Sequence, residues 1–397
     1  LPLAIAQAIT EQGHADLWMT KAANSTKRSS MDAVLTPSVQ PLERVSPVSS
    51  PLRTNDDMEM IREASRLTRD LNAPLAMIYW SDCLVSAAIG YTGLMAAIMA
   101  ERPAIQLAAA LIAMLALYRA SSFIHELTHV KPVMLPGFHR GWNLVIGIPL
   151  MIPSFMYEGV HNLHHQRTRY GTDLDPEYLP LALMKPVTVA LFLVTATLGP
   201  VGLLLRYGVL APLSLIIAPL RRINVARFSA LAINPGFRRA EAEGDFRRSW
   251  LILETLTSLW AMTLLAGVAS GRIPLRGFLI FLAIVAGALL LNQVRTLVAH
   301  LWENDGDPIS VTAQFLDSVN VPPPALLPAL WAPVGLRYHA LHHLLPGLPY
   351  HALGEAHRRL AAALPGDGTY ARANYKGLPG LAIKLIRGTF KGSGLPA

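Results

Sequence analysis

Cysteine is almost absent from this chain, since Cys83 is the single thiol among 397 residues. One thiol cannot form a disulfide within the chain, and an iron–sulfur cluster held by protein thiolates commonly needs four. The sequence also lacks a glycine-rich dinucleotide-binding motif between a strand and a helix. These absences exclude a nicotinamide site of that type and a cysteine-held cluster. Cys83 lies in an apolar stretch, where we expect a small buried side chain.

Charged residues are also scarce: they make up 15% of the chain, against 52% hydrophobic residues and a mean hydropathy of +0.37. This composition is typical of a protein that crosses a membrane several times rather than of soluble domains. The net charge of +8 does not indicate nucleic acid, because the arginines are not interleaved with aromatic residues. Seven arginines lie within residues 221–248, between apolar stretches, which is typical of a cytoplasmic loop.

Four apolar stretches are long enough to cross a membrane, which takes about 20 residues. Charged residues and Pro103 separate the first pair, and a turn from Gly271 to Pro274 separates the second. Two hairpins therefore bring the ends of the second and fourth stretches to the same side. We expect an all-α integral membrane protein with about four transmembrane helices. Their ranges are 74–100, 104–124, 250–270 and 276–299.

Two further apolar regions do not fit a simple span. The stretch 141–155 is short and rich in Gly and Pro, so we expect a re-entrant or interfacial segment there. Region 181–220 is divided by Gly199, Pro200 and Arg206. It is consistent either with a shallow hairpin or with two additional spans.

By composition the chain divides into four parts. The Ser- and Pro-rich beginning predicts a disordered tail, and Asn55 or Asp56 is placed to cap an amphipathic helix on the membrane surface. A long membrane domain follows, and then a C-terminal tail. The ranges are 1–55 for the first tail, 56–72 for the amphipathic helix, 73–362 for the membrane domain and 363–397 for the C-terminal tail.

The histidines are the most informative residues, because nine of the 13 lie at the ends of apolar stretches. The motifs HELTH, HNLHH and HALHH have helical spacing, so each presents its rings on one helix face. Neutral imidazole is a good ligand for iron, zinc and copper, whereas unpaired polar rings next to lipid are costly. A single histidine is commonly an ordinary buried ring, but three such clusters predict a metal centre. The nine expected ligands are His125, His129, His161, His164, His165, His300, His339, His342 and His343.

His300 differs from the others because no second histidine accompanies it, and a lone ring at the end of a span is commonly interfacial. Asn292 and Thr296 precede it at steps of four, so one face of the fourth span carries polar groups where lipid would exclude them. We expect that face to look into the metal site. Asn292 and Arg295 are then candidates for contact with the site, with helix packing as the alternative.

Carboxylates near the clusters are candidates to orient the rings, because a metal-bound histidine commonly donates its other ring nitrogen to such a group. The candidates are Glu126, Asp173, Asp175 and Glu303. Solvated loop charges are the alternative for each, and two of them precede Pro176 in a sequence that suits a turn.

The three motifs, in this order and with these apolar stretches between them, resemble the histidine boxes of the membrane fatty acid desaturase superfamily. The run from Arg295 to His300 is similar as well. The resemblance implies four transmembrane helices and a cytosolic helical cap. It also implies two iron ions held by the eight box histidines, with His300 matching a further ligand. O2 would be the co-substrate, and the expected reaction is desaturation of a lipid acyl chain.

Departures from the acyl-CoA branch favour a bacterial or acyl-lipid type. The first motif here is one residue shorter, and Thr296 stands four residues before His300 where that branch has asparagine. Two other functions stay open, because a shared framework does not separate related reactions. One is a hydroxylase or ketolase of a lipid, alkane or carotenoid, and the other is a non-enzymatic metal-binding membrane protein.

The expected partners are an acyl-lipid substrate, membrane lipid, and a separate electron donor of the ferredoxin or cytochrome type, without nucleic acid. The arginine-rich loop predicts a bacterial inner-membrane protein whose active site faces the cytoplasm. A basic surface there would attract an acidic donor. Its expected residues are Arg221, Arg222, Arg238, Arg239, Arg247 and Arg248.

Overall fold

The computed structural model describes residues 55–392, and in that range the chain is helical, with isolated β-bridges and no strand. The tail expected over 1–55 lies outside the described residues except for its last one. Four helices are long and apolar enough to cross a membrane, which confirms the expected all-α membrane fold. They are α3 (Ala76–Met99), α4 (Pro103–His129), α11 (Gly244–Ala269) and α12 (Leu275–Leu297).

The remaining elements are short. Before α11 they are α2 (Met58–Thr68), η1 (Arg69–Leu71), α5 (Phe138–Trp142), η2 (Asn143–Gly147), η3 (Ser154–Met156), α6 (His161–His164), η4 (Leu181–Leu183), α7 (Pro186–Thr197), α8 (Gly199–Leu205), η5 (Arg206–Leu210), α9 (Ala211–Ser214) and α10 (Ala218–Phe228). After α12 they are α13 (Val311–Asp317), α14 (Pro328–Trp331), α15 (His339–Leu344), η6 (Tyr350–Ala352), α16 (Leu353–Ala363), α17 (Thr369–Arg372) and α18 (Leu378–Gly392).

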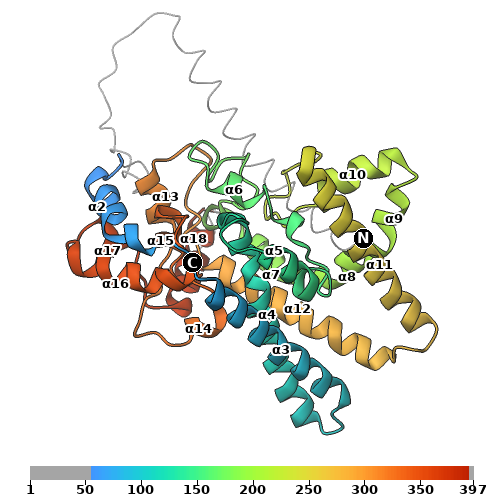
Figure 1. The fold of residues 1–397 in the computed structure, drawn as a ribbon. Helices are drawn as coiled ribbons and strands as arrows, with labels where there is room; N and C mark the ends of the chain where they lie inside the picture. The colour runs from blue at the N-terminus through green and yellow to red at the C-terminus, as the bar shows by residue number, and fades with distance from the viewer. Residues whose placement is uncertain (1–54, 393–397) are drawn as a thin grey trace, which may run out of the picture.

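Helices α3 and α4 form a tight hairpin that projects away from α2, α16 and α17 in Figure 1. Small residues permit the close approach: a Cβ on Gly93 would lie 3.1 Å from the Ala109 carbonyl oxygen and 3.2 Å from the Ala113 side chain. Such small-residue contacts are the usual way for helices to pack where lipid supplies no hydrophobic driving force. The hairpin delivers the end of α4, with its two histidines, to the cap.

The other two spans diverge from their connecting turn, and the region 181–220 fills the space between them (Figure 1). Helices α7 and α8 pack against α12, whereas η5 and α9 pack against α11. The pair formed by Pro186–Thr197 and Gly199–Ser214 is bent by 56°. The region therefore forms either one broken span or a re-entrant loop. Two additional spans are not present, because neither half of the bent pair is long enough to cross alone.

The short stretch 141–155 does not form a span but folds under the cap as α5, η2 and η3. Trp142, Ile146 and Phe155 are buried in the main hydrophobic core. The Trp142 ring nitrogen donates to the Ala120 carbonyl oxygen at 2.8 Å, which fixes this segment against α4.

The amphipathic helix near the start is α2, but its N-cap is Asp57 rather than Asn55 or Asp56. The Asp57 carboxylate accepts from the Met60 amide at 3.0 Å, whereas Asp56 accepts from the Thr312 amide at the start of α13. The expected capping residues were therefore wrong by one or two positions. Helix α2 buries Met60 against α16 and the neighbouring cap, so its membrane contact stays a prediction.

The expected C-terminal tail contains two helices in the described part, α17 and α18. Helix α18 packs against η4 and α7 and buries Leu381 and Leu385. Together with α2, α13, α15 and α16, these helices form the cap over the ends of α4 and α12.

Candidate metal centre

Nine histidines converge where α4 and α12 end, and they are the nine expected from the sequence. Their ring nitrogens form two groups, within each of which one nitrogen of every ring lies within 4.8 Å of the others. The first group is His125, His129, His161, His165 and His342, and the second is His164, His300, His339 and His343.

Each motif contributes through local helix geometry. Helix α4 places His125 and His129 one turn apart, while α6 and α15 are single helical turns that carry the other two motifs. The Nε2 atoms of His161 and His165 approach to 3.0 Å. In the second group, the Nε2 atoms of His300 and His339 lie 2.9 Å apart. HNLHH and HALHH each contribute to both groups.

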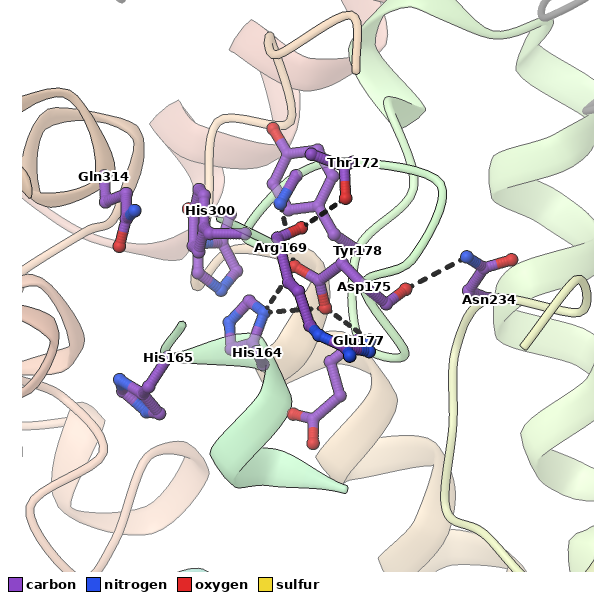
Figure 2. Close-up of polar contacts among 12 residues, drawn as sticks. His164, His165, Arg169, Thr172, Asp175, Glu177, Tyr178, Asn234, His300 and Gln314 are labelled. Carbon is purple, nitrogen blue, oxygen red and sulfur yellow. Dashed lines mark hydrogen bonds and ion pairs between the residues drawn. The ribbon is translucent and has the colours of Figure 1, made fainter. Parts of the chain in front are cut away.

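Carboxylates hold the outer edges of two rings, and Figure 2 shows the contact between Asp175 and His164. His164 Nδ1 lies 3.0 and 2.9 Å from the two Asp175 oxygens, and His161 Nδ1 lies 3.0 Å from Glu177 Oε2. An Nδ1–H that donates outward leaves the Nε2 lone pair directed inward. The structure places Asp175 beside the His164 ring, and its role in orienting a metal ligand stays a prediction. Glu177 was missed, although it follows Asp175 by two residues in the same turn.

Outside the histidine motifs, His300 is held through a tyrosine. Its Nδ1 lies 2.9 Å from the Tyr170 hydroxyl, which in turn donates to Asp317 Oδ2 at 2.8 Å. Tyr178 donates to the same carboxylate oxygen at 2.9 Å. Sequence analysis missed these partners, because the tyrosine precedes His300 by 130 residues and no local pattern connects them.

The ring nitrogens that face into each histidine group need a cation as their partner. Burial, together with neighbouring imidazoles, holds the pKa of His161, His165 and His300 well below the usual range, so these rings are neutral. With its Nδ1 hydrogen donated to Glu177, His161 presents an Nε2 lone pair to His165 Nε2 at 3.0 Å. His125 and His129 also bury ring nitrogens that have no hydrogen-bond partner. A metal ion in each group would be coordinated by one nitrogen of every ring, so the residues fit the expected metals.

Buried carboxylates near the rings also indicate that the site holds cations. Burial raises the pKa of Glu177 to about 7 and that of Asp317 to about 6. Burial opposes the charged form of His164 as well, but the Asp175 carboxylate outweighs it and the pKa of this ring is raised. A bound cation would favour the ionised carboxylates and the neutral rings together.

Other expected partners do not contact the rings. The Glu126 carboxylate accepts from Tyr79 and from the Tyr350 amide, and lies 3.5 Å from His125 Nδ1, too far for a good hydrogen bond. Asp173 was wrong as a candidate, because it is exposed on the turn.

Glu303 was also wrong, because its side chain pairs with Lys384 at 3.4 Å on the surface.

The basic surface needs correction too. Arg239 is buried against Trp250, and Arg221 pairs with Glu254, so neither is presented to a partner.

A cavity of about 390 Å³ adjoins both groups of rings. It lies between α7 and α12 and is closed by the segment after α10. Apolar side chains such as Leu191, Phe192 and Leu289 line one part. Asn292 and Arg295 line the part near the rings, as expected for residues that look into the site. The arrangement can hold an apolar chain beside two metal ions.

Comparison with known proteins gives the family. Residues 102–374 match the family described as Fatty acid desaturase. This chain belongs to that family. This chain is similar to a ceramide hydroxylase from Caulobacter vibrioides (strain NA1000 / CB15N). It is 52% identical over 326 residues, which cover 82% of this chain and 93% of that protein. No solved structure matches.

The relative corrects the expectation of acyl desaturation. A protein that is similar over nearly its whole length carries the name of a hydroxylase, so the alternative function is the better supported one. The error has a chemical cause, because the histidine motifs that led to it do not distinguish removal of two hydrogens from insertion of oxygen. The family and the relative together indicate that this protein is a membrane oxidoreductase that acts on lipid.

Proposed function

We propose that this protein is an O2-dependent hydroxylase of a ceramide-type lipid. The observation that carries the proposal is the 52% identity to a ceramide hydroxylase over most of both chains. The cavity beside the convergent histidines supports it, because apolar side chains line part of the cavity and would suit the chain of a lipid.

The proposed ligands are the two histidine groups, one for each of two iron ions. All-nitrogen donor sets suit iron, and the buried ring nitrogens without partners argue that the groups hold cations. Iron bound there would supply the O2-derived oxidant that an unactivated C–H bond requires.

The chain's own residues position the reactants. Asp175 and Glu177 hold the outer nitrogens of two rings, so that the inner nitrogens keep their direction. Leu191, Phe192 and Leu289 line the cavity with apolar surface, which favours the lipid chain over water. In the overall reaction a C–H bond becomes C–OH, the second oxygen atom leaves as water, and two electrons and two protons are consumed.

The electrons require a second protein. The single thiol and the lack of a dinucleotide-binding motif support a separate donor of the ferredoxin or cytochrome type. We further propose an inner-membrane location with the centre facing the cytoplasm. The arginine-rich segment 221–248 leads into the start of α11, on the same side as the ends of α4 and α12.

The test is expression in a ceramide-containing host supplied with isotopically labelled O2, followed by mass spectrometry of the lipids. We expect ceramide that has gained one labelled oxygen atom. His300→Ala should lose both product and iron while still inserting into the membrane. His351→Ala is the matched control, because His351 contacts the Leu75 amide outside both groups and should keep its iron. Products that have lost two hydrogens and gained no oxygen would overturn the proposal.

A further inference from the structure

Arg295 is a partly buried cation, and one of its donors is buried without a partner. It lies in the last turn of α12 and lines the cavity beside the rings. Its Nε has no hydrogen-bond partner, its Nη2 makes only a long contact of 3.4 Å with Asn292 Oδ1, and its guanidinium also contacts the Tyr118 side chain. Within residues 55–392 we find no carboxylate paired with it.

Arg206 shows how this protein otherwise accommodates a buried guanidinium. Its side chain donates to Glu254 at 2.7 Å, to the Ser229 hydroxyl at 2.9 Å and to the Phe228 carbonyl at 2.6 Å. A guanidinium carries five donors, and buried donors are rarely left unpaired. Arg206 Nη1 is also buried without a partner, but Arg206 has the Glu254 carboxylate as its counter-charge and lies outside the cavity lining. Arg295 lines the cavity and has no acceptor for its Nε, so a molecule that enters the cavity can supply one.

The cavity wall defines the chemistry of that molecule. Asn292, Gln293 and Arg295 of α12 all line the cavity, and Thr188 and Thr195 line it from α7. The sole acid in the lining, Glu177, is already engaged by His161 and Tyr157. One guanidinium with neutral amides and hydroxyls suits a neutral polar group with acceptor oxygens, whereas a plain hydrocarbon would leave the donors unpaired.

We propose that Arg295, with Asn292 beside it, binds the amide carbonyl oxygen of an N-acyl lipid substrate. The inference rests on the proposed function and deepens it by assigning what selects the substrate. Arg295 precedes His300 by only five residues, and both line the same cavity. The amide is therefore held close to the rings, and the hydroxyl group enters near the amide rather than in the middle of a chain.

The test measures binding without turnover. Wild type, Arg295→Met and Arg295→Lys are reconstituted in lipid nanodiscs with a fluorescent short-chain ceramide. Competition then compares unlabelled ceramide with its thioamide analogue, whose sulfur accepts hydrogen bonds more weakly than oxygen. Arg272→Met is the matched control, since Arg272 is exposed in the turn at the far end of α12. Iron content is measured in every sample.

We expect wild type and Arg272→Met to prefer the amide over the thioamide by about tenfold or more, the effect of one hydrogen bond to a charged group. Arg295→Met should bind ceramide weaker by a similar factor and show no preference, with its iron retained. Arg295→Lys, which keeps the charge but not the planar fork, should be intermediate.

Three results would overturn the inference. One is a wild-type amide preference in Arg295→Met. The second is loss of iron in both Arg295 variants, which would make the residue a support for the rings. The third is stronger competition by a fatty acid or a lipid phosphate than by ceramide. A desaturated product in the turnover experiment would instead refute the proposed function, while the amide preference would still be measured independently.

Discussion

At the scale of single residues, Asp175 offers the clearest test of how the rings are held. Asp175→Asn keeps the size of the side chain but removes the charge that faces His164 Nδ1. We expect iron affinity to fall by about 10- to 100-fold, because the ring loses its fixed orientation and some basicity. Iron titration of the purified variant measures the change.

Asp173→Asn is the control for this change, because Asp173 lies two residues earlier on the same turn and is exposed. It should bind iron like wild type. Equal iron affinity in both variants would show that the Asp175 carboxylate does not support the site.

The residues that could be predicted from sequence are those set by local geometry. HELTH and the other two motifs predicted their rings because helical spacing alone puts them on one face. Asp317 and Tyr170 could not be predicted, because they meet His300 only after distant parts of the chain pack together. Arg295 was noticed as polar in a span, but its unpartnered Nε becomes visible only with the cavity in place.

At the scale of elements, a buried ion pair fastens the bent region to a span. Arg206 in η5 and Glu254 in α11 lie 2.7 Å apart, and both side chains are nearly inaccessible. We expect Glu254→Gln to destabilise the fold by about 3–5 kcal/mol, because it leaves a buried guanidinium without its counter-charge. Thermal unfolding in detergent measures the loss.

The double variant Arg206→Met with Glu254→Leu is the matched comparison, since it removes both charges at similar volume. It should recover much of the lost stability, as apolar replacements of buried pairs commonly do. A double variant less stable than Glu254→Gln alone would indicate that Arg206 acts mainly through its contacts with the Tyr207 ring, the Phe228 carbonyl oxygen and the Ser229 hydroxyl.

The four spans could be predicted because each is a continuous apolar run of sufficient length. The region 181–220 could not, because Gly199 and Pro200 indicate a break but not its direction. The 56° bend depends on α7 fitting against α12 and on η5 fitting against α11. Helix α18 was missed as a packed element for a similar reason, since its partners η4 and α7 lie far away in the sequence.

At the scale of the whole molecule, the proposed reaction predicts a separate electron donor, because the chain has one thiol and no dinucleotide-binding motif. We expect the purified, iron-loaded protein to hydroxylate no lipid with NADPH alone. Turnover should appear when a ferredoxin or cytochrome-type donor and its reductase are added. Lipid analysis by mass spectrometry measures the product.

The charge on the protein predicts how that donor docks. Arg222, Arg247 and Arg248 are exposed, whereas Arg239 is buried, so the basic surface is smaller than the sequence suggested. Raising the ionic strength should therefore slow turnover at limiting donor concentration but leave the rate at saturating donor nearly unchanged, because screening weakens encounter rather than chemistry. A triple Gln variant at these three arginines should lose most of the salt dependence and keep its iron.

Undiminished turnover with NADPH in a preparation free of redox partners would contradict the need for a donor. An unchanged salt dependence in the triple variant would place the docking surface elsewhere.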